Sequence, residues 1–258
     1  PLTDTHGLVL SREQADANAK ILMQADPNEL KEIGGISSRR ASALPDAAAL
    51  LCALLSGLEP AGLVFSSWGL REGLLYEKLR PMVRQQDPLL AAIEAFATPL
   101  GGSTSIATSI ACWTGDVAND AGVSSERLRL AATMLAVAAA HLEPKIRTRH
   151  AVDWALHKHW IGLDMTGRAL IAAALIGACD KPALPSELLL LADESQLRQA
   201  LGWGLAIRLA QRIGGGSRRA LLGTSLTWEN DKLLLCSHAS SVDLIGDTVV
   251  SDLTALSS

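Results

Sequence analysis

The amino-acid sequence predicts a mainly α-helical chain with a minor β component, an α+β fold. About a third of the 258 residues are Leu or Ala, which favour helices, whereas the aromatic residues that favour strands make up 3%. Hydrophobic residues contribute 48% and charged residues 19%, so the chain must bury a large core and is not disordered as a whole. Strand patterns are missing between residues 87 and 213, where apolar residues recur with a helical period.

The first third of the sequence predicts helices around one strand. Ser11 can cap a first helix, and Pro27 at a first-turn position can begin a second. The almost wholly apolar segment after Pro45 predicts a buried helix. A short apolar run between turn residues then predicts a strand. The expected helices cover residues 11–23, 27–33, 46–58 and 70–79, and the strand covers residues 62–66.

The remainder predicts a helical region followed by a hairpin. The expected helices cover residues 88–98, 106–120, 125–141, 150–160, 166–179 and 195–213. Gly214-Gly215-Gly216 then ends the last of these helices. Residues 225–237 alternate in polarity, with Asn230-Asp231 in the middle, and predict a β-hairpin. A final helix over residues 241–256 has apolar residues on one face and can pack on the hairpin.

Two motifs lie on either side of the apolar helix. Arg39-Arg40-Ala41 precedes it, and the Gly-Leu-Arg-Glu-Gly element at residues 69–73 directly follows the short strand. This arrangement resembles the exopolyphosphatase and guanosine pentaphosphate phosphohydrolase family, Ppx/GppA. The rest of the chain resembles the C-terminal half of a long family member.

The resemblance implies three parts. Residues 1–82 would form the C-terminal part of the second actin-like (ribonuclease H-like) lobe. Residues 83–216 would form an all-helical, HD-like accessory domain, on which residues 217–258 would pack as a β-hairpin and a helix. Family members bind phosphate on glycine-rich loops that begin with Asp, and activate water with a Glu in the first lobe. None of these elements occurs here, so the resemblance implies no catalytic residue in this chain and no activity of the chain alone.

Three arginines are candidate phosphate ligands by this resemblance. Arg40 matches the arginine of the family's Arg-Ala-Asp segment, although Ser42 replaces the acid. Arg39 adjoins it, and a guanidinium can bind phosphate through two hydrogen bonds. Arg71 belongs to the Gly-Leu-Arg-Glu-Gly element. The alternatives are a solvated helix start for Arg39 and Arg40, and a local ion pair with Glu72 for Arg71.

A second group of basic residues lies between residues 145 and 168. Lys145, Arg147, Arg149 and Lys158 are the candidate ligands of a polyphosphate groove, since spaced cations bind a linear polyanion through counterion release. The alternative is an ordinary polar helix face. A His-Asp dipeptide is missing and no two histidines have metal-binding helical spacing, so no metal site is expected in the chain. Mg²⁺ is expected only for the full-length enzyme.

Together these observations give a functional hypothesis and its rivals. The parent enzyme would hydrolyse terminal phosphoanhydride bonds of inorganic polyphosphate or pppGpp. The rivals are a non-catalytic polyphosphate-binding and dimerisation module, and a purely structural helical domain. A net charge of −4 excludes a globally basic nucleic-acid binder. The longest nearly uninterrupted apolar runs reach about 11 residues, short of the ~20 of a membrane span, so we expect no membrane contact. We also expect a cytoplasmic protein and a homodimer.

Overall fold

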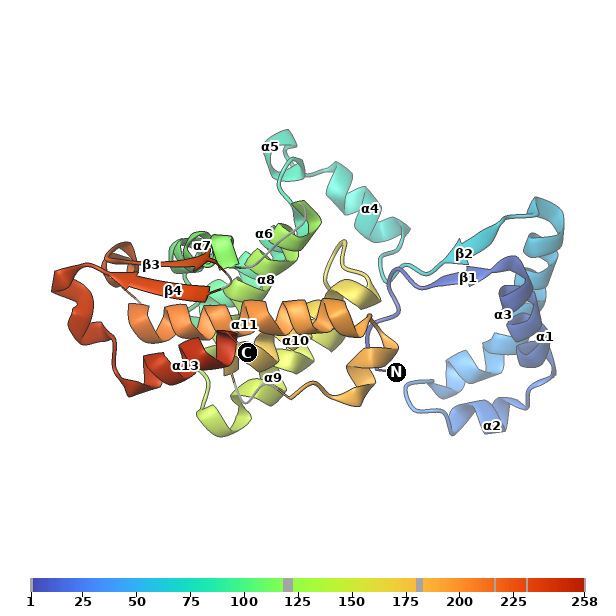
Figure 1. The fold of residues 1–258 in the computed structure, drawn as a ribbon. Helices are drawn as coiled ribbons and strands as arrows, with labels where there is room; N and C mark the ends of the chain where they lie inside the picture. Colours follow the sequence, from blue (N-terminus) through green and yellow to red (C-terminus); the bar gives the residue numbers. More distant parts are fainter. Residues whose placement is uncertain (1, 118–122, 180–182, 216, 231, 258) are drawn as a thin grey trace. The chain divides into compact units, whose positions relative to one another are not determined.

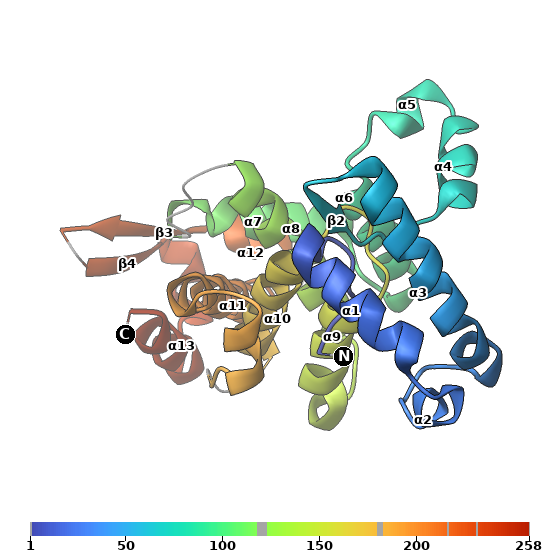
Figure 2. The same cartoon turned by 90° about the vertical axis from the view of Figure 1, so that its right-hand side faces the viewer.

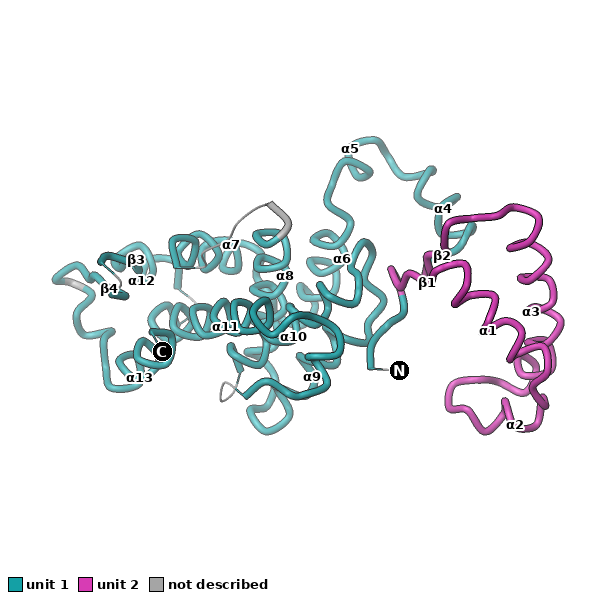
Figure 3. The backbone as a smooth tube through the Cα atoms, turned by 45° about the vertical axis from the view of Figure 1, so that its right-hand side comes forward, with its two compact units in different colours: residues 1–5, 67–258 teal, residues 6–66 magenta. Residues whose placement is uncertain are grey.

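The computed structural model of the protein describes residues 2–117, 123–179, 183–215, 217–230 and 232–257 (Figure 1). It is mainly helical, with two small two-stranded sheets in the described residues, which confirms the mainly α prediction. The chain forms two compact units: residues 6–66, and residues 1–5 together with 67–258 (Figure 3). The three-part division expected from the sequence stays a prediction.

The smaller unit contains three helices and one short sheet. Helix α1 (Arg12–Gln24) begins at the predicted Ser11 cap, which exchanges hydrogen bonds with Gln14. Helix α2 (Pro27–Lys31) begins at Pro27, as predicted. Strands β1 (Val9–Ser11) and β2 (Gly62–Val64) pair antiparallel. A Cβ on Gly62 would lie 2.8 Å from the Leu10 carbonyl oxygen, so this pairing requires glycine.

Helix α3 (Ser38–Leu58) begins before Pro45 and not after it, so the predicted start of this helix is wrong. Ser37 caps the helix by accepting the N–H of Arg40, and the N–H of Ala41 bonds to the Ser37 carbonyl. The turn is therefore already closed when the chain reaches Pro45. A proline inside a helix removes one backbone hydrogen bond, a loss that the rest of this 21-residue helix outweighs.

Helix α3 is also less buried than predicted. Only Ala41, Ala48 and Leu55 are buried, while Leu54 is 47% and Leu58 is 74% exposed. The helices that contact it, α1 and α2, cover one face. Among the described residues, α3 is the helix long and apolar enough to cross a membrane by length and composition, which is weak evidence for a span.

The larger unit contains the predicted helices and, in its described part, no strand between residues 87 and 213. Its helices up to the hairpin are α4 (Leu70–Glu77), α5 (Pro81–Arg84), α6 (Pro88–Ala97), α7 (Thr104–Trp113), α8 (Val123–Ala139), α9 (Pro144–His157), α10 (Met165–Cys179), α11 (Glu194–Gly214) and α12 (Arg218–Leu222). Short 3₁₀ helices occur at Thr98–Leu100, Gly115–Val117 and Ser186–Leu190. The end of the predicted helix 106–120 lies outside the described residues. Helix α9 begins earlier than expected because Pro144 occupies its first turn.

Helix α10 is the centre of this unit. Every residue from Gly167 to Ala178 is buried, and α8, α9 and α11 pack around it (Figures 1 and 2). Its crossing with α11 depends on two glycines. A Cβ on Gly204 would lie 1.9 Å from the Ala174 carbonyl oxygen, and one on Gly177 would lie 2.5 Å from the Leu201 carbonyl oxygen. The two backbones therefore touch directly.

The predicted hairpin is confirmed as strands β3 (Thr224–Glu229) and β4 (Lys232–Ser237). Asn230 has a φ of 48°, as a tight hairpin turn requires, and Asp231 lies outside the described residues. The Trp113 indole donates to the Thr224 carbonyl at 3.1 Å and joins the hairpin to α7. The predicted final helix is divided into a 3₁₀ helix (Ala239–Leu244) and α13 (Asp247–Ser257), which packs on α11.

The close crossing of α10 and α11 gives a direct test. Gly204→Ala should lower the free energy of unfolding by about 3 kcal/mol, because the added methyl group overlaps the α10 backbone. Gly202→Ala is the matched control, since nothing lies within 4 Å of its Cβ position. The control should raise stability by up to about 1 kcal/mol through helix propensity. Urea unfolding measures both, and equal effects of the two variants would contradict the crossing.

Candidate functional site

The four basic residues predicted for a groove do not share one helix face. Lys145 and Arg149 are exposed and four residues apart on α9, so they lie on the same side. Arg147 lies between them in sequence and therefore on another side of the helix. Lys158 follows the end of α9, roughly 20 Å along the axis from Lys145.

Arg147 binds the end of the preceding helix. Its guanidinium donates to the Ala140 carbonyl at 3.1 Å and to the Leu142 carbonyl at 3.0 Å. These carbonyls follow the C-terminus of α8, where acceptors lack partners within the helix and a cation is favourable. No carboxylate pairs with Arg147 in the described part of the chain, so its charge is not neutralised there.

Lys158 lies over aromatic rings. Its ammonium nitrogen is 4.5 Å from the centre of the Phe96 ring and 5.4 Å from that of Trp160. Phe96 also packs edge-on against Trp154 and Trp160. A cation over aromatic faces contributes about 0.5–1 kcal/mol at an exposed site. This contact gives Lys158 a structural role beside the predicted one.

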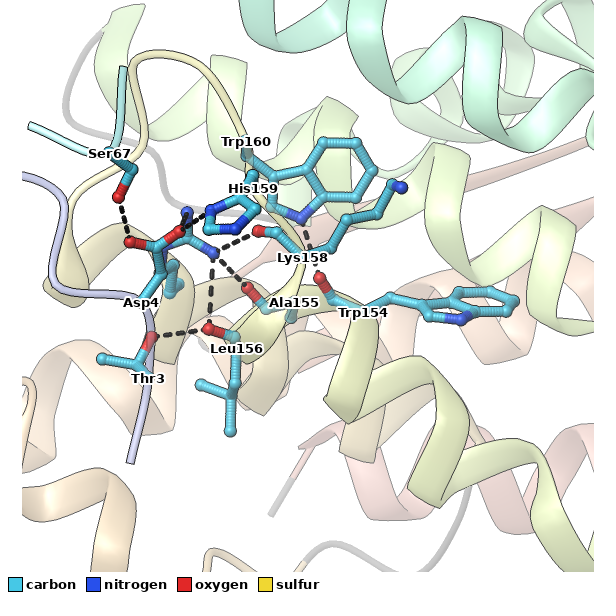
Figure 4. Close-up of polar contacts among 10 residues, drawn as sticks. Thr3, Asp4, Ser67, Trp154, Ala155, Leu156, Lys158, His159 and Trp160 are labelled. Carbon is cyan, nitrogen blue, oxygen red and sulfur yellow. Dashed lines mark hydrogen bonds and ion pairs between the residues drawn. The ribbon is translucent and has the colours of Figure 1, made fainter. Parts of the chain in front are cut away.

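Arg168, another basic residue in this stretch of sequence, is fully buried on α10. One of its terminal nitrogens donates to the carbonyls of Ala155 and Lys158, at 3.2 and 2.7 Å, at the C-terminus of α9 (Figure 4). The other lies 3.5 Å from the carboxylate of Asp4. Burial lowers the pKa of Arg168, while the charges of Asp4 and Asp164 oppose that shift. Arg168 therefore belongs to the core and not to an exposed groove.

Asp4 connects Arg168 to the start of the chain. Its side chain is 3% exposed and also meets His159, whose Nδ1 is 2.6 Å from the carboxylate, and Ser67, whose hydroxyl donates to it (Figure 4). The hydroxyl of Thr3 donates to the Leu156 carbonyl at 2.7 Å. The carboxylate lies between the serine and the histidine, so this is not the order in which a histidine would activate a serine. The hydrogen bond from Ser67 to Asp4 instead joins the segment that precedes residues 6–66 to the segment that follows them.

The three arginines implied by the family resemblance are exposed. Arg39 and Arg40 lie in the first turn of α3. Arg71 lies in the first turn of α4, where its guanidinium is 3.2 Å from Glu72. Glu72 also accepts the N–H of Gly69 at 2.9 Å. Its own backbone N–H, that of Gly69 and the Arg71 guanidinium lower the pKa of Glu72. The local ion pair considered for Arg71 is therefore present.

The structure brings Arg147 together with basic residues that the sequence reasoning missed. A cavity of about 630 Å³ in the larger unit is lined by Arg147, Arg208, Arg212 and Arg218, with His141 and Gln211. Arg208 and Arg212 both pair with the buried carboxylate of Asp252 on α13. Gly215 ends α11 beside this cavity, as predicted, and adopts a left-handed conformation. No local sequence signal could have joined Arg147 to the others, because Arg147 lies on α9 while the other arginines lie on α11 and α12.

The described residues do not supply a metal site. No group of three or more His, Cys, Asp or Glu side chains is placed to hold a metal ion within the described ranges. The Mg²⁺ expected for the full-length enzyme therefore finds no such carboxylate or histidine cluster among them.

A comparison with known families finds a match for the first part of the chain. Residues 1–81 match the Ppx/GppA phosphatase family. The match confirms the resemblance drawn from the motifs at residues 39–41 and 69–73, and is consistent with a member of this family. No curated protein matches the chain.

The buried Asp4 carboxylate gives a second test. Asp4→Asn should lower the free energy of unfolding by about 3 kcal/mol, because the buried Arg168 guanidinium loses the carboxylate it lies against. Glu194→Gln is the control. It removes an exposed pair with Arg198 and should cost less than about 1 kcal/mol. If urea unfolding shows the same small effect for both, Asp4 does not stabilise Arg168.

Proposed function

We propose that this chain is the C-terminal part of a cytoplasmic Ppx/GppA phosphatase that hydrolyses the terminal phosphoanhydride bonds of inorganic polyphosphate or of pppGpp. The family match over residues 1–81 carries this proposal. Within the matched part, the Gly69 turn places Arg71 and Glu72 in the first turn of α4. Arg39 and Arg40 are both exposed, as phosphate ligands need to be. In the complete enzyme these arginines would contact the phosphates and Mg²⁺ would neutralise charge.

The chemistry requires more than these donors. Hydrolysis of a phosphoanhydride needs charge neutralisation, donors that hold the phosphates, and a group that orients or activates water. The arginines can supply the first two in part. We assign the water-activating group and the phosphate loops to sequence outside this chain, and therefore propose that the chain alone is inactive. In the family context residues 1–82 would belong to an actin-like lobe and the helices after them to an HD-like accessory domain.

A second candidate function is a non-catalytic module that binds polyphosphate and dimerises. The observation that favours it is the pair Lys145 and Arg149, exposed on one face of α9. The structural roles of Arg147 and Arg168 in binding helix ends favour the third possibility, a structural helical domain. A polyphosphate-binding titration distinguishes the binding module from the structural domain.

The first functional prediction concerns activity. The purified 258-residue chain should release no phosphate from polyphosphate or pppGpp in the presence of Mg²⁺, because it holds donors without the other catalytic groups. A colorimetric phosphate assay measures this. The same assay on the chain extended at its N-terminus by the preceding residues is the positive control. Dose-dependent phosphate release by the 258-residue chain would contradict the proposal.

The second functional prediction concerns binding. Long-chain polyphosphate should bind with an affinity that falls steeply as salt rises, since each neutralised phosphate releases counterions. Replacing Lys145 and Arg149 by Ala should reduce the slope of log K against log salt by about 1 to 2. The control replaces Lys31 and Lys232, two exposed lysines on other elements, and should leave the slope unchanged. Equal slopes for both double variants would indicate that α9 is not the binding face.

A further inference from the structure

The cavity beside Arg147 has the size and lining of a small-molecule site. Its volume of about 630 Å³ falls within the roughly 300–1,000 Å³ of typical ligand pockets. The C-terminal ends of α8, α10 and α11 reach it, and α12 begins at its edge. All of these residues belong to the larger unit, so the site is complete within one compact body.

The polar part of the lining is strongly cationic. Four arginines, Arg147, Arg208, Arg212 and Arg218, line the cavity, and Asp252 pairs with two of them. The three helix C-termini contribute about half a negative charge each. Counted over the described residues, four positive charges against the one carboxylate named here and about one and a half dipole charges leave a positive excess. The cavity therefore favours an anion.

Two of these arginines have no carboxylate partner among the described residues and can offer N–H groups to a ligand. Arg147 is bound to backbone carbonyls, and Arg218 touches the Ser105 hydroxyl at 3.5 Å. Neither meets a carboxylate within the described residues. Arg218 is exposed in the first turn of a short helix, so its side chain can move at little cost. A phosphate group accepts charge-assisted hydrogen bonds from guanidinium groups and so matches the chemistry of these two lining residues.

The remainder of the lining is apolar. Ile106 and Ile110 of α7, Val137 of α8 and Leu221 of α12 form this wall, and Ile110 and Leu221 are almost fully buried. An inorganic anion gains nothing from such a wall. A molecule with an apolar or aromatic part beside its phosphate removes that part from water, together with Ile106, the partly exposed residue of this wall.

We propose that this cavity binds a phosphorylated organic molecule of nucleotide size, with its phosphate held by Arg147 and Arg218 and its organic part against the wall formed by Ile106, Ile110, Val137 and Leu221. The site is separate from the arginines assigned to phosphate binding under the proposed function. It would hold its ligand in the chain as it stands, whether or not the parent enzyme cleaves polyphosphate.

The test is a calorimetric titration of the full chain in EDTA with ATP, inorganic triphosphate and adenosine as probes. ATP should bind about tenfold more tightly than inorganic triphosphate, because only ATP can use the apolar wall. Adenosine, which lacks the phosphates, should not bind measurably. If inorganic triphosphate binds as tightly as ATP, or if ATP does not bind at low salt, the proposal is overturned.

Two variants place the binding in this cavity. Arg218→Ala should weaken ATP binding about tenfold, whereas Arg219→Ala, which changes the next residue and does not line the cavity, should leave it within about twofold. Ser217→Trp fills the cavity edge from an exposed position and should abolish binding while the circular dichroism spectrum stays the same. Equal losses for Arg218→Ala and Arg219→Ala, or full binding by Ser217→Trp, would overturn the assignment.

Discussion

The direct contact of the α10 and α11 backbones is the constraint on which the larger unit depends. Gly177 and Gly204 allow it, because any side chain there would overlap the opposing backbone. The contact buries α10 between its neighbours and also sets the rotation of α11. Residues 208, 211, 212 and 215 follow Gly204 at helical spacings, so this stripe of α11 lines the cavity. The ends of α10 and α11 thus meet one cavity because of where the two helices cross.

Arginine side chains have a common structural role in this unit. Arg147 binds carbonyls that follow the C-terminus of α8, and Arg168 binds carbonyls at the C-terminus of α9. A helix C-terminus leaves acceptors without partners, and a guanidinium from a neighbouring segment satisfies several at once. The positive charge of Arg168 is paired with the carboxylate of Asp4, and this ion pair attaches the start of the chain to α10. The positive charge of Arg147 is not paired with any carboxylate among the described residues. Arg168 therefore stabilises the core through an ion pair, whereas Arg147 contributes a positive charge to the cavity.

Features of the fold that depend on neighbouring residues could be predicted from the sequence, whereas features that depend on tertiary packing could not. The Ser11 cap, the Gly215 terminator and the hairpin turn at Asn230 depend on neighbouring residues, and the sequence predicted all three. The start of α3 was wrong because Ser37 closes the helix before Pro45 can begin it. Strand β1 was missed because three residues carry little pattern and their partner strand is distant. The sequence grouped Arg147 with its neighbours on α9, whereas tertiary packing places it in the lining of the same cavity as Arg212 and Arg218. Charge clusters built from several helices have no signature in a linear pattern.

In our proposal, packing of the helical unit creates a site for an organic phosphate. The most direct measurement is a crystal structure of the chain grown with ATP in EDTA. We expect density for a phosphate within hydrogen-bond distance of Arg147 and Arg218, with the base or ribose against Ile110 and Leu221. An empty cavity with ATP ordered at another surface would contradict it.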